Sequence, residues 1–462
     1  MPIQRRTDFN PAPARSRSPR GGGAAAAAAL AAALVLLALA APGSLLARGT
    51  SPAADPPGGA WSGEPGEWGA GLGDVGLDGP GSGDVHAPAF LESSLRQVLE
   101  DKIGLGHFAG AVFAGQANGL EVSVAAGHFD LAGGVPMPGN ALFRLSSVSK
   151  AFISVLAARM IESGEISLDD PVTKFLPGFT PAAPGGSAPQ ITFGQLLTHT
   201  SGLSYAFSET SGGPLHRAGV SVGCESSPGL TLEENMRRLA GAPLLSRPGR
   251  RHAYSHSADV AGAAMAAAAG KSLPDLMRER VLDPLGLRDT GFHAVDPSRL
   301  GTAYVFSNKG PRPRLMSDPE SYPLGRGRAF EFSPSRALDR DAWPSGGCGM
   351  VSSARDVMKL TEVINGLASG SPSDRWFMED HIAPQVSSPG EGFAGGWAIL
   401  KSPVPYGPYS PGTVTWGGVY GHRWFADPTA GISGVVLTNT AMKAMLGDTL
   451  ELLARNLYEL PR

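Results

Sequence analysis

The pattern of apolar and polar residues predicts a helix and a hairpin at the start of the folded region. Between Phe90 and Ile103, five apolar side chains fall on one face of a helix: Leu91, Leu95, Val98, Leu99 and Ile103. The runs AGAVFAGQ and LEVSVAAG then flank Asn118-Gly119. Two short apolar runs around Asn-Gly are a strong signal for a β-hairpin.

A second helix is predicted from Ser147 to about Ser163, and it is apolar on most sides. Such a helix is usually buried in the middle of a domain, and Gly164 is suited to end it. The centre of the chain, roughly 150–300, is mostly helical with Pro and Gly breaks. Residues 301–345 are predicted to form a long, irregular, charged loop region.

Strand patterns return near the end of the chain in TVTWGG, HRWFAD and ISGVVLTNT, and a final helix is predicted from about Gly447 to Leu457. Strands therefore lie at both ends, with helices between them. The expected fold class is α+β: one antiparallel sheet built from both chain ends, flanked by N- and C-terminal helices, with a helical subdomain at roughly 150–345 inserted.

The first 50 residues differ from the rest. Five arginines precede an unbroken Ala/Leu/Val run from Ala24 to Ala41, and Ala38-Leu39-Ala40 fits a cleavage site. Residues 1–50 are predicted to be a targeting segment, so that the protein is secreted, membrane-anchored or organellar. Membrane association is expected only through 24–41. Residues 51–87 are predicted to be a disordered Gly/Pro linker, and 88–462 the folded domain.

Composition narrows the function classes. The net charge is −3 and no basic patch with interleaved aromatics occurs, so no nucleic-acid partner is expected. The two cysteines, Cys224 and Cys348, have no metal-ligand spacing, and neither a metal nor another cofactor is predicted. A disulfide between them is the less favoured interpretation, and we expect two small hydrophobic side chains.

Candidate chemistry appears at the start of the buried helix, in LFRLSSVSK. Ser147 and Lys150 are three residues apart, so both side chains face the same way on a helix. A lysine amine held against a serine hydroxyl can help to remove its proton, and the helix N-terminus favours an oxyanion there. The alternative is an ordinary serine near a helix start with a solvated lysine, but a solvated lysine is unexpected in so apolar a helix.

Two further stretches could complete such a site. Tyr254 precedes a helix predicted from about Ser257, and a tyrosinate near a lysine can act as a general base. Trp416-Gly417-Gly418 follows a short strand, and paired glycines allow a ligand to approach the backbone. Taken alone, a packing tyrosine and a strand bend explain these stretches better.

Ser221 offers a competing nucleophile, because Gly219 to Gly223 match G-x-S-x-G. That motif requires a strand before it and a helix after it, whereas both flanks here are loop-like. We therefore expect Ser221 not to be the nucleophile.

Together the three stretches resemble the active-site motifs of the class C β-lactamase-like serine hydrolases, with the family VIII carboxylesterases as the nearest match. The resemblance covers about residues 90–460. Four other stretches agree with it: LLTHTSGLSY (Leu196 to Tyr205), VLDPLGLRDTGF (Val281 to Phe292), PSGGCGMVSSARDV (Pro344 to Val357) and WGGVYGHRWFADP (Trp416 to Pro428). The expected fold is accordingly β-lactamase/transpeptidase-like.

The resemblance implies roles for these residues. Ser147 would form an acyl-enzyme, and Lys150 and Tyr254 would share the proton transfers. The backbone N–H groups of Ser147 and Val419 would form the oxyanion hole, and Trp416 would line the substrate pocket.

Two departures from the family pattern bear on the substrate. Trp416 stands where many β-lactamases and penicillin-binding proteins have the lysine of Lys-Thr-Gly, which favours neutral, partly apolar esters. His256 stands where Y-x-N members have asparagine, and its role stays open. His422 could line the pocket or have a structural role.

The leading hypothesis is a serine carboxylesterase that acts on small-molecule esters. A β-lactamase or D-Ala-D-Ala peptidase is the alternative among enzymes, and a catalytically silent scaffold is the alternative outside them.

Overall fold

The computed structural model describes residues 89–306, 312–382, 391–402, 407–443 and 447–461. The predicted targeting segment 1–50, its apolar run 24–41 and the linker 51–87 lie outside these residues. Within the described part of the chain, no helix has both the length and the apolar character needed to cross a membrane.

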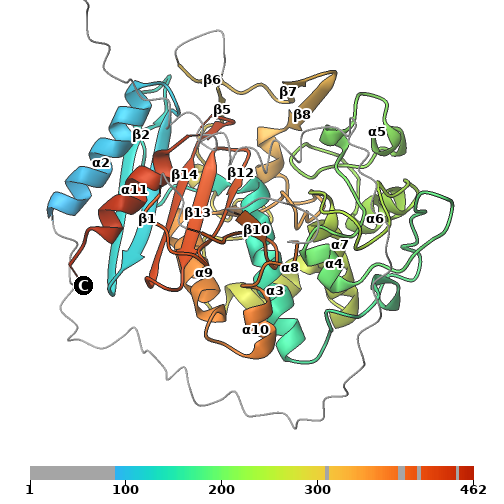
Figure 1. Ribbon diagram of the computed structural model, residues 1–462. Helices are drawn as coiled ribbons and strands as arrows, with labels where there is room; N and C mark the ends of the chain where they lie inside the picture. The colour runs from blue at the N-terminus through green and yellow to red at the C-terminus, as the bar shows by residue number, and fades with distance from the viewer. Residues whose placement is uncertain (1–88, 307–311, 383–390, 403–406, 444–446, 462) are drawn as a thin grey trace, which may run out of the picture.

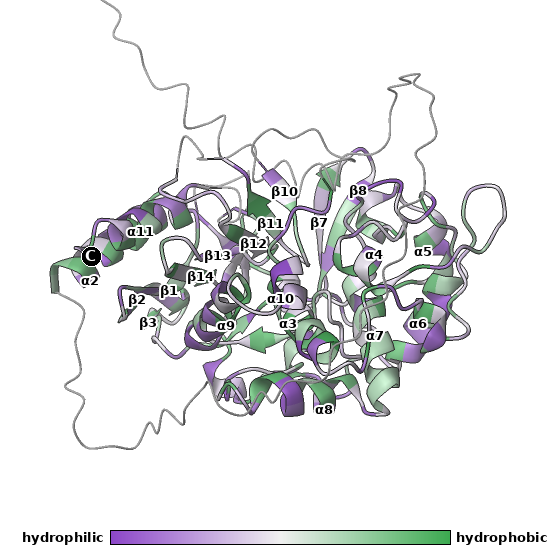
Figure 2. Cartoon of the chain, turned by 60° about the horizontal axis from the view of Figure 1, so that its bottom comes forward, coloured by the Kyte–Doolittle hydropathy of each residue, from purple (hydrophilic) through white to green (hydrophobic). Residues whose placement is uncertain are grey.

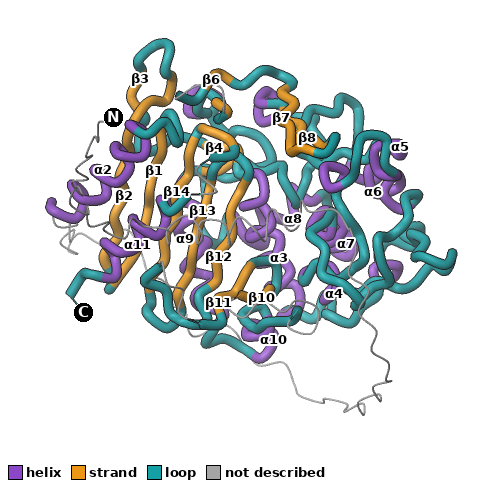
Figure 3. The backbone as a smooth tube through the Cα atoms, turned by 45° about the horizontal axis from the view of Figure 1, so that its top comes forward, coloured by secondary structure: helices purple, strands orange, loops and turns teal. Residues whose placement is uncertain are grey.

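An antiparallel sheet of eight strands forms the centre of the fold, in the order β10-β11-β12-β13-β14-β1-β2-β3 (Figures 1 and 3). From the N-terminal part come β1 (Gly110–Ala117), β2 (Leu120–Asp130) and β3 (Val135–Pro136). From the C-terminal part come β10 (Glu391–Phe393), β11 (Ala398–Leu400), β12 (Val414–Gly418), β13 (His422–Asp427) and β14 (Ile432–Thr438). The two parts join where β1 pairs with β14, which confirms the predicted sheet built from both chain ends.

The predicted hairpin is β1–β2, with Ala117 opposite Leu120. Asn118 and Gly119 have φ angles of 54° and 76°, as a two-residue type I′ turn requires. Most of β1 is buried, because helices cover both faces of the sheet there.

Helices α2 (Ala89–Gly104) and α11 (Thr449–Tyr458) lie side by side on one face of the sheet (Figure 1). Figure 2 shows green and purple residues on both helices, as expected for helices that bury only one side. Their apolar sides share a core with the sheet that includes Leu95, Leu99, Phe113, Phe425 and Leu453. On the other face lies α9 (Ala354–Leu367), which contacts β1, β13 and β14.

The helical subdomain follows β4 (Phe143–Arg144). It contains α3 (Ser149–Glu162), α4 (Phe193–Leu197), α5 (Pro214–Ala218), α6 (Leu232–Ala240), α7 (Ser257–Ala269) and α8 (Leu273–Met277). A π-helical turn at Arg278–Leu282 continues α8, and the short α10 (Pro372–Trp376) packs against α3. Eleven of the fourteen residues of α3 are buried, so the prediction of a central helix is confirmed.

The prediction of an irregular loop at 301–345 is wrong in part. The structure has β5 (Tyr304–Val305), β6 (Arg314–Leu315), β7 (Glu320–Gly325) and β8 (Arg328–Phe332) there, and β5 pairs in parallel with β15 (Thr440–Ala441). The β7–β8 hairpin turns at Arg326 and Gly327, whose φ angles are 54° and 69°. These strands are short and rich in charge, and their pairing depends on tertiary contacts that sequence periodicity does not report.

Candidate active site

Ser147 lies in a 3-10 turn, Ser146–Val148, that leads directly into α3. Three neighbouring serines have different surroundings. Ser146 is 1% exposed and donates to the Leu145 carbonyl, and Ser149 is 0% exposed and accepts from the Met350 N–H. Ser147 alone of the three is partly exposed. A hydroxyl that must meet a substrate needs this access, so the structure agrees with the choice of Ser147.

Two side chains converge on the Ser147 hydroxyl. Tyr254, just before α7, donates to Ser147 Oγ over 2.7 Å, and Lys150 Nζ lies 3.3 Å from the same atom. Lys150 is 2% exposed, and its Nζ lies 4.7 Å from the centre of the Tyr254 ring. The three predicted catalytic residues therefore meet at one point, in the arrangement that an activated serine nucleophile requires.

Lys150 has a further partner that the sequence did not reveal. Its Nζ donates to the Gly347 carbonyl over 2.6 Å, a shorter contact than the one to Ser147. Gly347 belongs to PSGGCGMVSSARDV, which supported the family resemblance but received no role there. The Tyr205 ring, from LLTHTSGLSY, lies 5.4 Å from Nζ, and burial raises the pKa of its hydroxyl well above the usual value. Tyr205 therefore stays protonated beside the lysine.

The end of β12 lies against the 3-10 turn Ser146–Val148, which we call the nucleophile turn. A Cβ on Gly418 would come within 2.4 Å of Ser146 Oγ and 2.5 Å of the Leu145 carbonyl oxygen, so only glycine permits this approach. Val419 follows directly, and its carbonyl accepts from Met442. The Ser147 N–H stands in the first turn of the helical segment, where backbone N–H groups have no intrahelical acceptor. An oxyanion hole formed by the Ser147 and Val419 N–H groups stays a prediction, with the two chain segments adjacent as it requires.

Trp416 contributes an aromatic wall beside the serine. Its ring centre is 5.4 Å from that of Tyr254 and 5.4 Å from that of Phe393. Alternation along β12 places Trp416 and Gly418 on the same face and Gly417 on the other. Because Gly417 has no side chain, it can contribute to the site only through its backbone.

The two histidines near the motifs are both fully buried. His256 faces Asp259, with Nδ1 3.2 Å from Oδ2, and no contact between His256 and Ser147 is found within the described ranges. His422 Nδ1 accepts from the Thr438 N–H, so Nε2 carries the proton and donates to the Arg144 carbonyl over 2.8 Å. Burial lowers the pKa of His422 to about 4. The structure therefore favours a structural role for His422 over a place in the pocket.

Ser221 lies in a loop, with neither a strand before it nor a helix directly after it. It is 4% exposed, and its hydroxyl contacts Ser227 and Trp343. This surrounding confirms that the G-x-S-x-G match is no nucleophile elbow.

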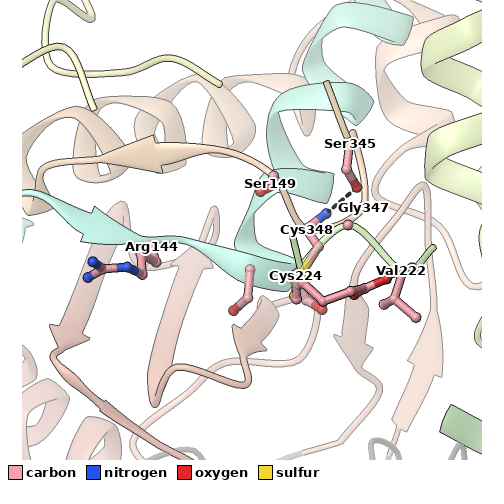
Figure 4. Close-up of a disulfide and its surroundings, with 12 residues drawn as sticks. Arg144, Ser149, Val222, Cys224, Ser345, Gly347 and Cys348 are labelled. Carbon is pink, nitrogen blue, oxygen red and sulfur yellow. Dashed lines mark hydrogen bonds between the residues drawn. A yellow bond between two sulfur atoms is a disulfide. The ribbon is translucent and has the colours of Figure 1, made fainter. Parts of the chain in front are cut away.

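The expectation of two free cysteines is wrong. Cys224 and Cys348 form a disulfide, with their Cα atoms 5.4 Å apart (Figure 4). The two residues are 124 positions apart, and they meet only because the loop around Val222 folds against the loop that contains Gly347. The sequence offered no local signal for this pairing, and its consequence is a covalent link next to the residue that binds Lys150.

A cavity of about 930 Å³ lies elsewhere, between α6, α7 and the segment 340–344. None of the predicted site residues lines it. We therefore place the candidate active site at Ser147, where the reactive groups converge, and not at this cavity.

Comparison with known proteins agrees with this geometry. A sequence model of the Beta-lactamase family matches residues 95–457. Esterase EstB of Burkholderia gladioli is 38% identical over 371 residues, which are 78% of this chain and 93% of EstB. Lovastatin esterase of Penicillium rubens is 26% identical over 71% of this chain and 90% of its own.

Among solved structures, one similar to this chain is described as "EstCE1, a hydrolase with promiscuous acyltransferase activity". It is 40% identical, has a TM-score of 0.74, and the match covers 80% of this chain and 98% of EstCE1. The β-lactamase/transpeptidase-like fold expected from the sequence is thereby confirmed. With the family match spanning most of the chain and the S-x-x-K, Y-S-x and W-G-G elements gathered around one serine, the protein belongs to the β-lactamase family.

Proposed function

We propose that the protein is a serine carboxylesterase in which Ser147 forms the acyl-enzyme. The observation that carries this proposal is the partly exposed Ser147 hydroxyl, which contacts both Tyr254 (2.7 Å) and Lys150 (3.3 Å) at the start of a buried helix. The likeness to Esterase EstB over most of both chains supports it.

In the acylation step, Tyr254 and Lys150 together take the Ser147 proton while Oγ bonds to the ester carbonyl carbon. The carbonyl oxygen becomes an oxyanion beside the Ser147 and Val419 N–H groups and the positive end of the helix. As the intermediate collapses, the carbon–oxygen bond to the alcohol breaks, and the alcohol leaves with the proton held by the pair. Water then attacks the acyl-enzyme, gives its proton to the same pair, and Ser147 recovers its proton as the acid leaves.

The substrate class follows from the wall beside the serine. Trp416 and Tyr254 present aromatic rings, the fully buried Phe393 packs against Trp416, and Trp416 replaces the lysine that would attract a substrate carboxylate. Neutral esters with an apolar acyl group fit this wall better than β-lactams or peptidoglycan stems.

A fluorophosphonate probe, with p-nitrophenyl acetate and butyrate as substrates, tests the proposal. Wild type should be labelled and turn over both esters, Ser147→Ala should do neither, and Ser221→Ala should behave as wild type. Loss of labelling in Ser221→Ala and not in Ser147→Ala overturns the assignment. Turnover of nitrocefin as fast as of the esters favours the β-lactamase alternative, and absence of labelling and turnover in wild type favours a silent scaffold.

A further inference from the structure

Asp259 is a completely buried carboxylate in the first turn of α7. Burying a charged group is costly unless hydrogen bonds compensate for the lost water. The residue before α7, His256, makes no side-chain cap. Among the described residues, the side-chain hydrogen bonds of Asp259 run to the loop at 345–347 and to His256, and none runs to an N–H group of its own helix. Its Oδ1 accepts instead from Ser345 Oγ at 2.7 Å and from the Gly347 N–H at 2.9 Å.

The loop that donates these hydrogen bonds lies between α7 and the nucleophile turn. Gly347 is held at both of its backbone polar groups: its N–H donates to Asp259, and its carbonyl accepts from Lys150. A Cβ on Gly347 would lie 2.9 Å from both Asp259 Oδ2 and the Tyr205 hydroxyl oxygen. Glycine therefore allows the loop to come close enough for Asp259 to reach it.

Other contacts hold the same loop on its remaining sides. Arg336 donates to the carbonyls of Trp343 and Gly349, and the Met350 N–H donates to Ser149. Figure 4 shows Gly347 beside the disulfide, with the Cys348 N–H donating to Ser345 Oγ. None of these contacts is made to Gly347 itself, whereas Asp259 bonds to its N–H and so acts on the same residue as Lys150.

The fixed carbonyl determines where the lysine amine stands. A lysine side chain has four rotatable bonds, and ordering it costs conformational entropy. The 2.6 Å contact to Gly347 is shorter than the 3.3 Å contact to Ser147, so the carbonyl is the stronger anchor of Nζ. If Gly347 turned away, Lys150 would lose this anchor and Ser147 would lose its aligned base.

We propose that Asp259 is a positioning residue for acylation: through Gly347 it holds Lys150 against Ser147, and His256 supports Asp259 from its other oxygen. This inference rests on the proposed function. It also gives His256 a role, because the ring that stands in place of the family's asparagine contacts Asp259 at 3.2 Å and lies 4.4 Å from the Tyr205 ring.

The test compares kcat and KM for p-nitrophenyl acetate in Asp259→Ala, Asp259→Asn and wild type. In Asp259→Ala we expect kcat to fall by about 10- to 100-fold, because Lys150 is displaced from Ser147. KM should stay unchanged, because the aromatic side chains around Trp416 that bind the substrate are intact. The rate of fluorophosphonate labelling should fall in parallel. Asp259→Asn should recover most of the loss, because an amide oxygen can still accept from Gly347.

Asp356→Ala is the matched control. Asp356 is also buried and accepts two hydrogen bonds, from the Asp289 N–H and Thr290 Oγ1 at 2.8 Å each, but it lies outside the candidate site. The Asp356→Ala substitution should lower the unfolding temperature and leave kcat unchanged. If Asp259→Ala does not fold, Gly347→Ala replaces it, since the added methyl group displaces the loop from Asp259 and should lower kcat in the same way.

A folded Asp259→Ala protein whose kcat stays within about twofold of wild type overturns the positioning role, as does a rise in KM at constant kcat. Failure of the proposed function can be distinguished from failure of this positioning role, because only wild type and Ser147→Ala are needed to detect it. Wild type would then turn over no ester, or Ser147→Ala would keep full turnover.

Discussion

Tyr254 donates a hydrogen bond of 2.7 Å to Ser147 across 107 positions of sequence, whereas Lys150, three residues from Ser147, stands 3.3 Å away and makes its shorter contact with Gly347. The residue nearest in sequence is therefore not the one most closely bonded to the nucleophile. Tyr254 is placed to exchange a proton with Ser147 directly, and Lys150 is placed to support that exchange.

Tyr254→Phe should lower kcat for p-nitrophenyl acetate by about 10²- to 10⁴-fold, because it removes the group that shares the serine proton. The ring keeps its packing against Trp416 and His199, so the unfolding temperature should change little. Steady-state kinetics and thermal unfolding measure the two effects. Retention of wild-type kcat in this variant excludes Tyr254 from proton transfer.

Lys150→Met should abolish labelling of Ser147 and also destabilise the fold. The buried Gly347 carbonyl would lose its donor, which costs about 1–3 kcal/mol. Lys174→Met is the control, because Lys174 is exposed and pairs with Asp170 on the surface. Urea unfolding should separate the two variants, and equal unfolding midpoints contradict this account.

Gly418→Ala should impair both activity and stability, since its Cβ would collide with Ser146 and Leu145 and push β12 away from the nucleophile turn. Gly366→Ala in α9 meets no atom within 4 Å and should leave kcat unchanged. Kinetics and thermal unfolding of both variants check this. If Gly418→Ala keeps wild-type kcat, the close approach of β12 is not required for turnover.

Removing the disulfide with the double substitution Cys224→Ser and Cys348→Ser should lower the free energy of unfolding by about 2–5 kcal/mol. Because Cys348 follows Gly347, we also expect slower labelling of Ser147. A reductant should shift the unfolding midpoint of wild type toward that of the double variant. If wild type and the double variant have equal unfolding midpoints when both are measured without reductant, this would falsify the contribution of the disulfide.

Stability should fall with acidification between pH 6.5 and about 4. Burial lowers the pKa of both His422 and His252 from 6.5 to about 4. In that range the unfolded chain binds protons that the folded protein does not, so the stabilisation is complete above pH 6.5 and is lost as the pH falls. Each histidine contributes up to about 1.4 kcal/mol per pH unit to this slope.

His422→Gln should reduce the slope, because the glutamine amide does not titrate and can still donate to the Arg144 carbonyl. Urea unfolding of wild type and variant at pH 5 and pH 7.5 gives the comparison. An unchanged difference between the two pH values rules out His422 as a source of the dependence.

The parts of the fold that the sequence predicted depend on local patterns. The β1–β2 hairpin could be predicted from Asn118-Gly119. Apolar periodicity, together with residues that typically begin or end a helix, predicted α2, α3, α7 and α11. The short strands at 301–345 were missed, since they are two to six residues long and are stabilised by pairing with distant segments.

The candidate site divides in the same way. Ser147 and Lys150 could be paired from their spacing alone, and Tyr254 and Trp416 joined them through the family resemblance. Gly347 acts through its backbone from a position 197 residues beyond Lys150, and Asp259 acts through Gly347. Backbone carbonyls carry no residue-type signal, and neither contact falls within the span of a helix or hairpin.

The pairing of β1 with β14 also bears on synthesis of the protein. Ala111 lies opposite Thr438, so the N-terminal hairpin leaves the ribosome more than 300 residues before its neighbour in the sheet. During that time the apolar edge of β1 stays open, and such edges pair readily with other chains. We expect the nascent chain to need a chaperone or rapid completion, and overexpression at a lower temperature to raise the yield of folded protein.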